Sequence, residues 1–506
     1  MFAASFPKFG YPAFAWIALS PLIVAVAAPS SRGVRSATST FVLGLVTGLV
    51  YFGGTVYWVV GVMRTFGSLS TSVAVLVGLL LASYLALYPA FFALLLRRAI
   101  QRFGEAGLWL APVLWVATEW LRGVVGGGFP WVLLGASQAT VTPIVQLASI
   151  TGVYGLSALV ALVSTAAAAV AVSRRRVHRF GAIVTAAVVI VVAVAGAMRV
   201  RWGTLTTDGR PMRVGLVQGS VEQVDKYDTR FRDAILRRYL DLSRETIAAG
   251  ANLVVWPEAS TPFYFDANTI LAAPVRALAA QTHTPFIIGT DEMSTPERDQ
   301  PEQYYNSAVF VGADGRSRGT YRKMHLVPFG EYVPLRRALF FVAPLVESVG
   351  DLSPGTKPVV FDDDGRRLSV AICYESVYPE ILRSFVVRGS ELLVTITNDA
   401  WFDRSSAAYQ HFAQGSLRAV EEGRYVVRAA NTGVSGAIDP YGRVLVRTDL
   451  FVPVSLAVDV RLLDGRTIYN RIGNLFAWLS TIAAGWVALT GRRKLGTRRG
   501  AGPVVS

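Results

Sequence analysis

Long apolar stretches alternate with short basic loops over about the first 200 residues, and ordinary globular patterning follows them. A helix needs about 20 apolar residues to cross the hydrocarbon core of a bilayer. The pattern predicts six such spans before residue 200 and a seventh near the end of the chain. These spans cover residues 11–28, 40–62, 71–96, 106–122, 144–172, 180–198 and 470–490. We therefore expect a polytopic α-helical membrane domain over residues 1–200, and a final transmembrane helix with a basic cytoplasmic tail over residues 464–506.

The segment between them, residues 210–463, alternates strand-like and helix-like patterns. Its apolar runs end in polar residues, and a helical stretch covers residues 228–248. Strands that alternate with helices indicate a layered α/β domain. The runs are PMRVGLVQGS, NLVVWPEAS, TPFIIGT, NSAVFVG, RRLSVAICYES and ELLVTITND.

Composition and charge support a membrane protein. Hydrophobic residues make up 52% of the chain, charged residues only 16%, and the formal net charge is +15. The basic residues gather in the loops SSRGVRS, RRAIQR and SRRRVHR and in the tail GRRKLGTRRG, whereas the intervening loops carry little charge. By the positive-inside rule the rich loops are cytoplasmic, so residues 210–463 are expected on the extracytoplasmic side. Basic residues beside apolar spans favour anionic lipid headgroups over nucleic acid as the partner.

The single cysteine, Cys373, stands at the end of the strand-like run RRLSVAIC. The chain cannot form an intrachain disulfide, and its four histidines are scattered, so the sequence predicts neither a metal site nor a cofactor. Active-site residues often follow the carboxyl ends of strands in α/β folds. A buried structural cysteine is the more ordinary interpretation of one such residue.

Two other segments change that balance. Glu258 follows the apolar run NLVVW and Pro257, and Lys323 lies between a strand-like run and the irregular stretch HLVPFGEYVP. A cysteine nucleophile needs a base, which a buried carboxylate with a raised pKa can supply. A lysine ammonium can stabilise the oxyanion of an acyl transfer. Each residue has a simpler interpretation, a helix-start carboxylate for Glu258 and a solvated surface lysine for Lys323, and spacing alone does not bring the three together.

The segments VVWPEAS, YRKMHLVPFGEYVP and AICYE resemble the three motif blocks of the nitrilase (carbon–nitrogen hydrolase) superfamily, in its order of Glu, Lys and Cys. With the flanking spans, EWLRG, GFPWVLLGASQ and TNDAWF, nearly the whole chain resembles the apolipoprotein N-acyltransferase family. One departure is the N-terminus, where that family usually has a further helix before the first span. Whether such a helix precedes Met1 stays open here.

The resemblance implies an αββα sandwich in which Glu258 is the base, Lys323 the oxyanion stabiliser and Cys373 the nucleophile. It implies supporting roles for Glu331 and Glu375. It also implies the reaction, in which a phospholipid acyl chain passes through a thioester on the enzyme to the N-terminal cysteine of a diacylglyceryl apolipoprotein. The expected location is the bacterial inner membrane.

Two expectations concern lipid access. The apolar stretch 336–350 is expected to form an arm or lid that exposes Phe340 and Phe341 to lipid, with a buried helix as the alternative. Trp131, beside three consecutive glycines, is expected to line the lipid entry, with an ordinary turn as the alternative.

Two other functions compete with this one. A membrane-tethered nitrilase-type amidase would use the same three residues with water as the acceptor. A non-catalytic transporter or scaffold is less well supported, because transporters carry polar residues along several spans and these spans are mostly Ala, Val, Leu and Gly.

Overall fold

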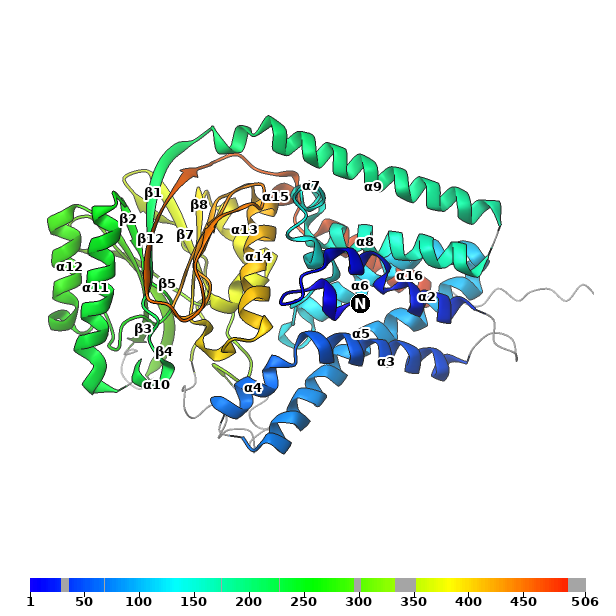
Figure 1. Cartoon of the computed structure of the whole chain (residues 1–506), viewed down its shortest axis with the longest axis horizontal. Coiled ribbons are helices and arrows are strands. Elements are labelled where there is room, and N and C mark those ends of the chain that lie inside the picture. Colours follow the sequence, from blue (N-terminus) through cyan, green and yellow to red (C-terminus); the bar gives the residue numbers. More distant parts are fainter. Residues whose placement is uncertain are drawn as a thin grey trace, which may run out of the picture.

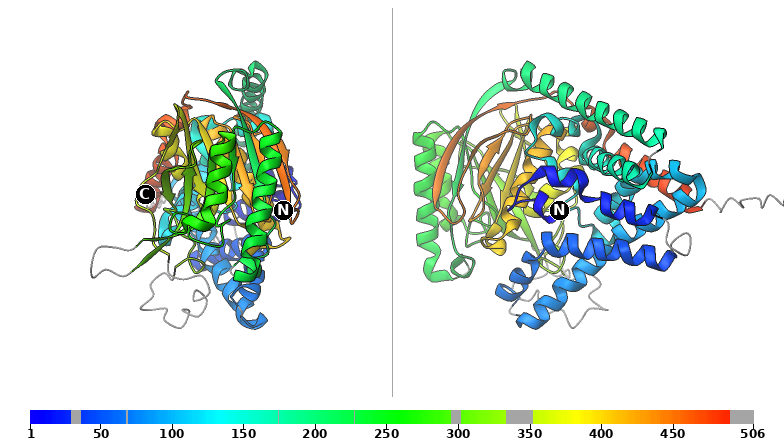
Figure 2. Two further views of the ribbon diagram at one scale, coloured as in Figure 1. Left: turned by 90° about the vertical axis from the view of Figure 1, so that its left-hand side faces the viewer. Right: turned by 45° about the vertical axis from the view of Figure 1, so that its right-hand side comes forward.

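The apolar helices and the α/β segment form two halves at opposite ends of an elongated molecule (Figure 1; Figure 2, right). The structure is a computed structural model. It describes residues 1–28, 36–67, 69–173, 175–226, 228–294, 302–332 and 352–489.

The helical half is built from the apolar runs. Four stretches are long and apolar enough to cross a membrane: Ala37–Thr55, Thr71–Gly127, Ala148–Val172 and Arg176–Thr206. The second of them contains two helices, α5 and α6. Shorter apolar helices cover Pro12–Ala27 and Leu475–Leu489. The elements are η1 (Ala3–Ser5), η2 (Pro12–Phe14), α1 (Ala15–Ala18), α2 (Ser20–Ala27), α3 (Ala37–Thr55), α4 (Trp58–Thr65), α5 (Thr71–Phe103), η3 (Gly104–Leu110), α6 (Ala111–Val124), η4 (Val125–Gly127), η5 (Leu134–Gln138), α7 (Thr142–Val145), α8 (Ala148–Val172), α9 (Arg176–Trp202), η6 (Thr204–Thr206), α15 (Ile468–Ile472) and α16 (Leu475–Leu489).

Two of the expected spans differ from the helices observed. The span 40–62 is divided, because α3 ends at Thr55 and α4 begins at Trp58. The span 11–28 is divided into η2, α1 and α2, and two prolines occupy early positions in η2 and α2. Proline lacks the N–H that a continuous helix requires and fits best in the first turn, so these two prolines favour the start of a new helix.

Helix α9 connects the two halves. It runs along one side of the helical half and leads directly into the first strand of the α/β half (Figure 1). Of the most apolar 18 residues in the stretch Arg176–Thr206, only 11% are buried inside the protein. Ile183, Ile190 and Val191 are exposed. A helix that is apolar on faces without protein neighbours is typical of contact with lipid.

The α/β half contains two six-stranded sheets. The strand orders are β12-β1-β2-β3-β4-β5 and β11-β10-β9-β8-β7-β6. The strands are β1 (Arg210–Gln218), β2 (Leu253–Val255), β3 (Phe286–Ser294), β4 (Gln303–Val311), β5 (Ser317–Arg322), β6 (Phe361–Asp363), β7 (Arg366–Ile372), β8 (Leu392–Thr397), β9 (Val426–Ala430), β10 (Gly436–Ile438), β11 (Val444–Arg447) and β12 (Val454–Leu462). The helices are α10 (Gln223–Lys226), η7 (Thr229–Phe231), α11 (Arg232–Ala248), α12 (Thr269–Thr282), η9 (Cys373–Val377), α13 (Pro379–Val387), η10 (Asp399–Phe402) and α14 (Ser406–Glu422).

The sheets pack face to face, and helices cover their outer sides. In β2, Leu253 and Val255 belong to the core that both sheets share, whereas Val254 belongs to the cluster beneath α11 and α12. This alternation is the two-residue period of a strand. On the other side, α13 and α14 lie between the second sheet and the helical half (Figure 1). The expected αββα sandwich is confirmed, and one of its outer helical layers faces the membrane helices.

Candidate active site

Glu258, Lys323 and Cys373 each follow the carboxyl end of a strand. Glu258 comes three residues after β2, Lys323 directly after β5, and Cys373 directly after β7. The first two strands belong to one sheet and β7 to the other. Strand ends from the two sheets therefore bring together residues that are far apart in the sequence.

Lys323 forms the centre of a buried charged cluster. Its Nζ donates to Glu331 Oε1 at 2.7 Å and lies 3.4 Å from Glu258 Oε1. Its side chain is only 1% exposed. The side-chain amide of Asn306 donates to both carboxylates, at 2.7 Å to Glu258 and 3.2 Å to Glu331. The backbone N–H of Asn398 donates to Glu258 Oε2 at 2.7 Å, so both oxygens of Glu258 are held.

These contacts set the protonation states. Burial alone would raise the pKa of Glu258, but the Lys323 ammonium, the Asn306 amide, the Lys226 charge and the Asn398 N–H together lower this pKa below its usual range. Burial acts in the expected direction, but the net pKa of this base is lowered, because cations and N–H donors surround the carboxylate. Burial would lower the pKa of Lys323, but Glu331 and Glu258 raise it. At neutral pH Glu258 is consequently an ionised acceptor and Lys323 a cation.

Cys373 occupies a strained turn. Its φ is +52°, in the left-handed region that non-glycine residues seldom adopt, and the residue is 7% exposed. Burial raises the pKa of its thiol, the Glu258 charge raises it further, and Lys323 opposes both. The sulfur thus lies within the electrostatic reach of both charged partners. It keeps its proton at rest and needs a base to become a nucleophile.

Glu375 connects the segment that carries Cys373 to the segment that carries Lys323. Its Oε2 accepts from the Ile372 N–H at 2.7 Å, directly before the cysteine. Its Oε1 accepts from the Met324 N–H at 2.7 Å, directly after the lysine, and from the Tyr321 hydroxyl at 2.7 Å. The side chain is fully buried, and burial raises its pKa to about 7. It cross-links the two strand ends.

A second polar network holds the carbonyl of Cys373. His411 Nε2 lies 3.0 Å from this carbonyl oxygen, and Arg428 Nη2 lies 2.9 Å from His411 Nδ1. Asp399 accepts from Arg428 at 2.8 Å. Burial and the Arg428 charge lower the pKa of His411, so the ring is neutral. His411 Nδ1 also lies 3.0 Å from Asp399 Oδ1, so the ring is held between the Asp399–Arg428 pair and the Cys373 carbonyl and supports the unusual backbone conformation.

The residues that follow Cys373 pack against the helical half. The ring of Tyr374 stacks on Trp131 with centroids 6.2 Å apart, and the Tyr378 hydroxyl donates to the Gly128 carbonyl at 3.0 Å. Tyr378 also packs on His325, two residues after Lys323, at 3.9 Å between ring centroids. The candidate site therefore lies where the sandwich meets the apolar helices.

Trp131 does not face lipid, which corrects the expectation from sequence. It is 1% exposed, and its Nε1 donates to Gln410 Oε1 at 2.7 Å. Its loop is fixed from the helical half, because Arg122 donates to the carbonyls of Phe129 and Trp131, both at 2.7 Å. A tryptophan is buried readily when its N–H finds an acceptor. Phe340 and Phe341, with the expected arm 336–350, lie outside the described residues.

No group of three His, Cys, Asp or Glu side chains that could hold a metal ion occurs among the residues that the structure describes. The cluster around Lys323 consists of oxygens that already accept from nitrogen donors. The chemistry available to it is attack by sulfur, proton transfer to a carboxylate and stabilisation of negative charge by an ammonium.

The two-sheet sandwich, with its glutamate, lysine and cysteine at strand ends, defines a protein of the carbon-nitrogen hydrolase class that is joined to membrane helices. Residues 213–463 match the carbon-nitrogen hydrolase family, and residues 1–166 match the N-terminal domain of apolipoprotein N-acyltransferase. The apolipoprotein N-acyltransferase of Geobacter metallireducens is 41% identical over 98% of this chain and 94% of its own. That of Nitrosomonas europaea is 34% identical over 96% of each chain. The chain belongs to the apolipoprotein N-acyltransferase family and is a membrane protein.

Among solved structures, an amidase from Nesterenkonia sp. is similar to this chain. Its sequence is 23% identical, the match covers 56% of this chain and 98% of that chain, and the TM-score is 0.39.

Proposed function

We propose that this protein N-acylates the lipid-modified N-terminal cysteine of apolipoproteins, with a phospholipid as the acyl donor. One observation carries the proposal: the nucleophile segment Cys373–Tyr378 packs on the loop of the helical half that contains Gly128 and Trp131, while Cys373 stays within reach of the Glu258 and Lys323 charges. Both substrates have acyl chains anchored in a bilayer, and such a junction suits them.

In the first half-reaction the Cys373 sulfur attacks the ester carbonyl of the phospholipid. Glu258 accepts the thiol proton as the carbon–sulfur bond forms, because a free thiolate beside this carboxylate is disfavoured. The Lys323 ammonium stabilises the oxyanion. The carbon–oxygen ester bond then breaks, and the alkoxide takes the proton from Glu258. The lysophospholipid leaves, and a thioester remains on Cys373.

In the second half-reaction the α-amine of the apolipoprotein's N-terminal cysteine attacks the thioester. Glu258 accepts a proton from this amine, an amide bond forms, and the carbon–sulfur bond breaks. The sulfur recovers its proton, so the enzyme returns to its starting state. A covalent intermediate of this kind gives ping-pong kinetics.

Glu331, Glu375 and the domain order complete the proposal. Glu331 keeps Lys323 charged and oriented, and Glu375 holds the two catalytic segments in register.

The helical domain comprises residues 1–200, the catalytic domain residues 210–463, and the last helix and tail residues 464–506. The chain crosses the bacterial inner membrane several times, with the catalytic domain on the extracytoplasmic side, as the distribution of basic loops indicates.

A substrate comparison tests this function. Purified protein should transfer an acyl chain from phospholipid to a diacylated lipopeptide, and should hydrolyse small aliphatic amides at least about 100-fold more slowly, because the site adjoins apolar helices rather than open solvent. Mass spectrometry of the lipopeptide and release of ammonia measure the two reactions. Amide hydrolysis without acyl transfer would instead establish the membrane-tethered amidase.

Replacement of Glu375 by glutamine should reduce acyl transfer by about 10²-fold and the free energy of unfolding by about 1–3 kcal/mol. In the wild type each carboxylate oxygen of Glu375 accepts from a backbone N–H. Glutamine replaces one of these oxygens by an NH₂ donor, which leaves one buried backbone N–H unpaired. An unpaired buried N–H costs about this much. Thermal melting and the rate of acyl transfer measure both effects. Tyr321→Phe is the matched control, because it removes one donor to Glu375 and leaves the backbone contacts, so its effect should be several-fold smaller.

Glu375→Gln should also change the pH dependence of the free energy of unfolding. The pKa of Glu375 is raised to about 7 in the folded protein, above the value of about 4.3 in unfolded chains. The folded state therefore binds this proton more tightly, and stability declines as pH rises from about 4.3 to 7. Glu375→Gln should remove this part of the decline. An unchanged slope would contradict a titrating Glu375.

A further inference from the structure

Asp291 lies beside the candidate active site but takes no part in the contacts of the charged cluster around Lys323. It belongs to β3 and pairs with Asn306 of β4 in the antiparallel register. The Lys323 N–H donates to the Asn306 carbonyl at 2.9 Å, so the ladder between β4 and β5 continues to the lysine. Residues that pair across a ladder share one face of the sheet. Asp291, Asn306 and Lys323 therefore form one row across three neighbouring strands.

Glu258 packs against the same strand as Asp291. Gly289 lies two residues before Asp291 in β3, and a Cβ atom at Gly289 would stand only 2.7 Å from the Glu258 Cα. Alternate residues of a strand share a face and are about 7 Å apart. Asp291 therefore lies on the face that Glu258 covers, about 7 Å farther toward the carboxyl end of β3.

The Asp291 carboxylate is open to a substrate. No hydrogen bond or ion pair to this carboxylate occurs among the residues that the structure describes. Its side chain is only partly buried, whereas Glu258, Glu331 and Lys323 are buried. Asp291 is therefore an unpaired acid at the outer side of the buried cluster.

The charges around Asp291 make it an ionised group that can accept a proton. The titratable groups within its electrostatic reach are Lys226, Glu258, Tyr264, Lys323 and Glu331. Burial is the main cause that raises the pKa of Asp291 to about 6, and the cations Lys226 and Lys323 oppose it. At neutral pH the carboxylate is still ionised. It is also a better proton acceptor than an aspartate of ordinary pKa.

The second half-reaction proposed above needs such a group. An α-amino group has a pKa of about 7.7–8.0, so the acceptor arrives mainly as an ammonium at neutral pH. Only the neutral amine has the lone pair that attacks a thioester. Glu258 accepts the proton that leaves as the amide bond forms, so the first proton requires another acceptor.

We propose that Asp291 binds the α-ammonium of the acceptor's N-terminal cysteine and accepts its first proton, an inference that rests on the proposed function. One N–H bond breaks and an O–H bond forms on Asp291, which leaves a neutral amine beside a neutral carboxyl group. The amine attacks the thioester, and Glu258 takes the second proton and passes it to the departing sulfur. Asp291 returns its proton to water, which its partial exposure allows.

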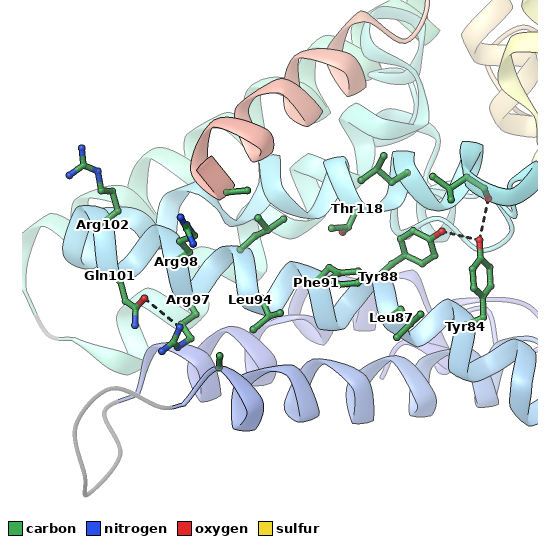
Figure 3. A pocket seen from close by; sticks show the side chains of 15 residues that line it. Tyr84, Leu87, Tyr88, Phe91, Leu94, Arg97, Arg98, Gln101, Arg102 and Thr118 are labelled. Carbon is green, nitrogen blue, oxygen red and sulfur yellow. Dashed lines mark hydrogen bonds between the residues drawn. The ribbon is translucent and has the colours of Figure 1, made fainter. Parts of the chain in front are cut away.

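The position of Asp291 favours the acceptor over the donor as the source of the ammonium. An ethanolamine headgroup also carries an ammonium, but several bonds separate it from the ester carbonyl that Cys373 attacks. The α-amine is itself the reacting group, and it must come to Glu258, the neighbour of Asp291. The helical half has a separate groove of about 750 Å³ along α5, which Tyr84 and Phe91 help to line (Figure 3). No acidic side chain is among the described residues that line this groove, so it offers an ammonium no charged partner.

Single-turnover kinetics of the acylated full-length enzyme test the proposal. The enzyme is first loaded with an acyl chain from phosphatidylglycerol, and a diacylated lipopeptide is then added. Asp291→Asn should raise the half-saturating lipopeptide concentration about tenfold at pH 7.5, which is the scale of one hydrogen bond to a charged group. Formation of the acyl-enzyme and its hydrolysis by water should be unchanged, because neither phosphatidylglycerol nor water carries an ammonium. Normal formation of the acyl-enzyme also shows that the variant is folded.

The pH dependence and two further variants separate charge from shape. The wild-type carboxylate loses its charge as pH falls through about 6, so the advantage of the wild type over Asp291→Asn should shrink from pH 7.5 to pH 5. Asp291→Glu should recover part of the affinity for the lipopeptide. Glu292→Gln is the matched control, because this adjacent carboxylate points to the other face of β3 and pairs with Arg322. Its half-saturating concentration should be that of the wild type.

The measurements distinguish failure of this inference from failure of the proposed function. An unchanged half-saturating concentration in Asp291→Asn, with normal acyl-enzyme formation, would overturn the inference and leave the proposed function standing. Slower acylation of Asp291→Asn by phosphatidylethanolamine but not by phosphatidylglycerol would overturn it too, because the carboxylate would then serve the donor headgroup. A wild-type protein that forms no acyl-enzyme from either phospholipid would contradict the proposed function, and this inference with it.

Discussion

Replacement of Cys373 by serine should reduce acyl transfer by at least about 10⁴-fold, which is the scale on which covalent enzymes depend on their nucleophile. A serine hydroxyl in this place is a much weaker nucleophile at neutral pH than the sulfur. The hydroxyl is nearly isosteric with the thiol, so the left-handed turn and its contact with His411 should persist. The rate of lipopeptide acylation measures the loss, and an unchanged melting temperature excludes unfolding.

The covalent intermediate provides an independent measurement. Cys373 is the only cysteine in the chain, so every thiol adduct belongs to this residue. After exposure to phospholipid without lipopeptide, the intact wild-type protein should gain the mass of one acyl chain and resist alkylation. Hydroxylamine should reverse both changes, because it cleaves thioesters. Cys373→Ala is the matched control and should gain no acyl mass. A free thiol in the wild type under these conditions would count against the thioester mechanism.

The strand ends could be predicted because they depend on local pattern. In RRLSVAIC the alternation of Leu368, Val370 and Ile372 indicates a strand, and β7 indeed ends at Ile372. Pro257 indicates the end of the preceding strand, and β2 ends at Val255. A strand end exposes the next side chain at the edge of a sheet, so Glu258 and Cys373 were identifiable as candidates before any contact between them was known.

The polar partners of these residues could not be predicted, because they depend on contacts between distant segments. Asn306 lies inside β4, where it stands beside Ser307 between two tyrosines and an apolar run. Its contact with Glu258 exists only because β4 pairs with β3, which pairs with β2. His411 and Arg428 come from α14 and β9, and nothing in their local sequence points to the Cys373 carbonyl. A polar residue inside a buried strand was the one signal available.

The error at Trp131 has a related cause. An aromatic residue beside Gly126, Gly127 and Gly128 in a membrane half is typical of a mobile loop at a lipid boundary. The sandwich covers this loop instead, and Gln410 of α14 supplies the acceptor for the indole. Hydropathy reports how well a segment tolerates lipid, but it does not report which face another domain will cover.

Replacement of Lys323 by methionine should have the largest combined effect on activity and stability. The variant keeps the length of the side chain but leaves Glu258 and Glu331 as two buried carboxylates that share the Asn306 amide. Removal of one partner from a buried ion pair typically costs about 3–5 kcal/mol. Loss of the oxyanion stabiliser should add a reduction of about 10²- to 10³-fold in acyl transfer. Chemical denaturation and the rate of transfer measure the two effects.

A second substitution separates structure from chemistry. Lys323→Met with Glu331→Gln removes one carboxylate together with the cation, so it should recover most of the stability at neutral pH while the activity stays low. Lys226→Met is the matched control, because this buried lysine donates to the Glu258 backbone carbonyl at 3.4 Å, and its charge lowers the pKa of the Glu258 carboxylate less than Lys323 does. It should retain more activity than Lys323→Met. Equal activity losses in the two single variants would refute a specific role of Lys323 in stabilising the oxyanion.

The stability of Lys323→Met should depend on pH in a direction that can be predicted. In the wild type the pKa of Glu258 is lowered in the folded protein, so this carboxylate stabilises the fold above its unfolded pKa, and the contribution is lost as pH falls. Without Lys323, burial raises the pKa of Glu258 instead. The folded variant then binds protons more tightly than the unfolded chain does. Its stability deficit relative to the wild type should therefore shrink between pH 7 and pH 5, and a deficit that grows over this range would show that Lys323 does not keep Glu258 ionised in the folded protein.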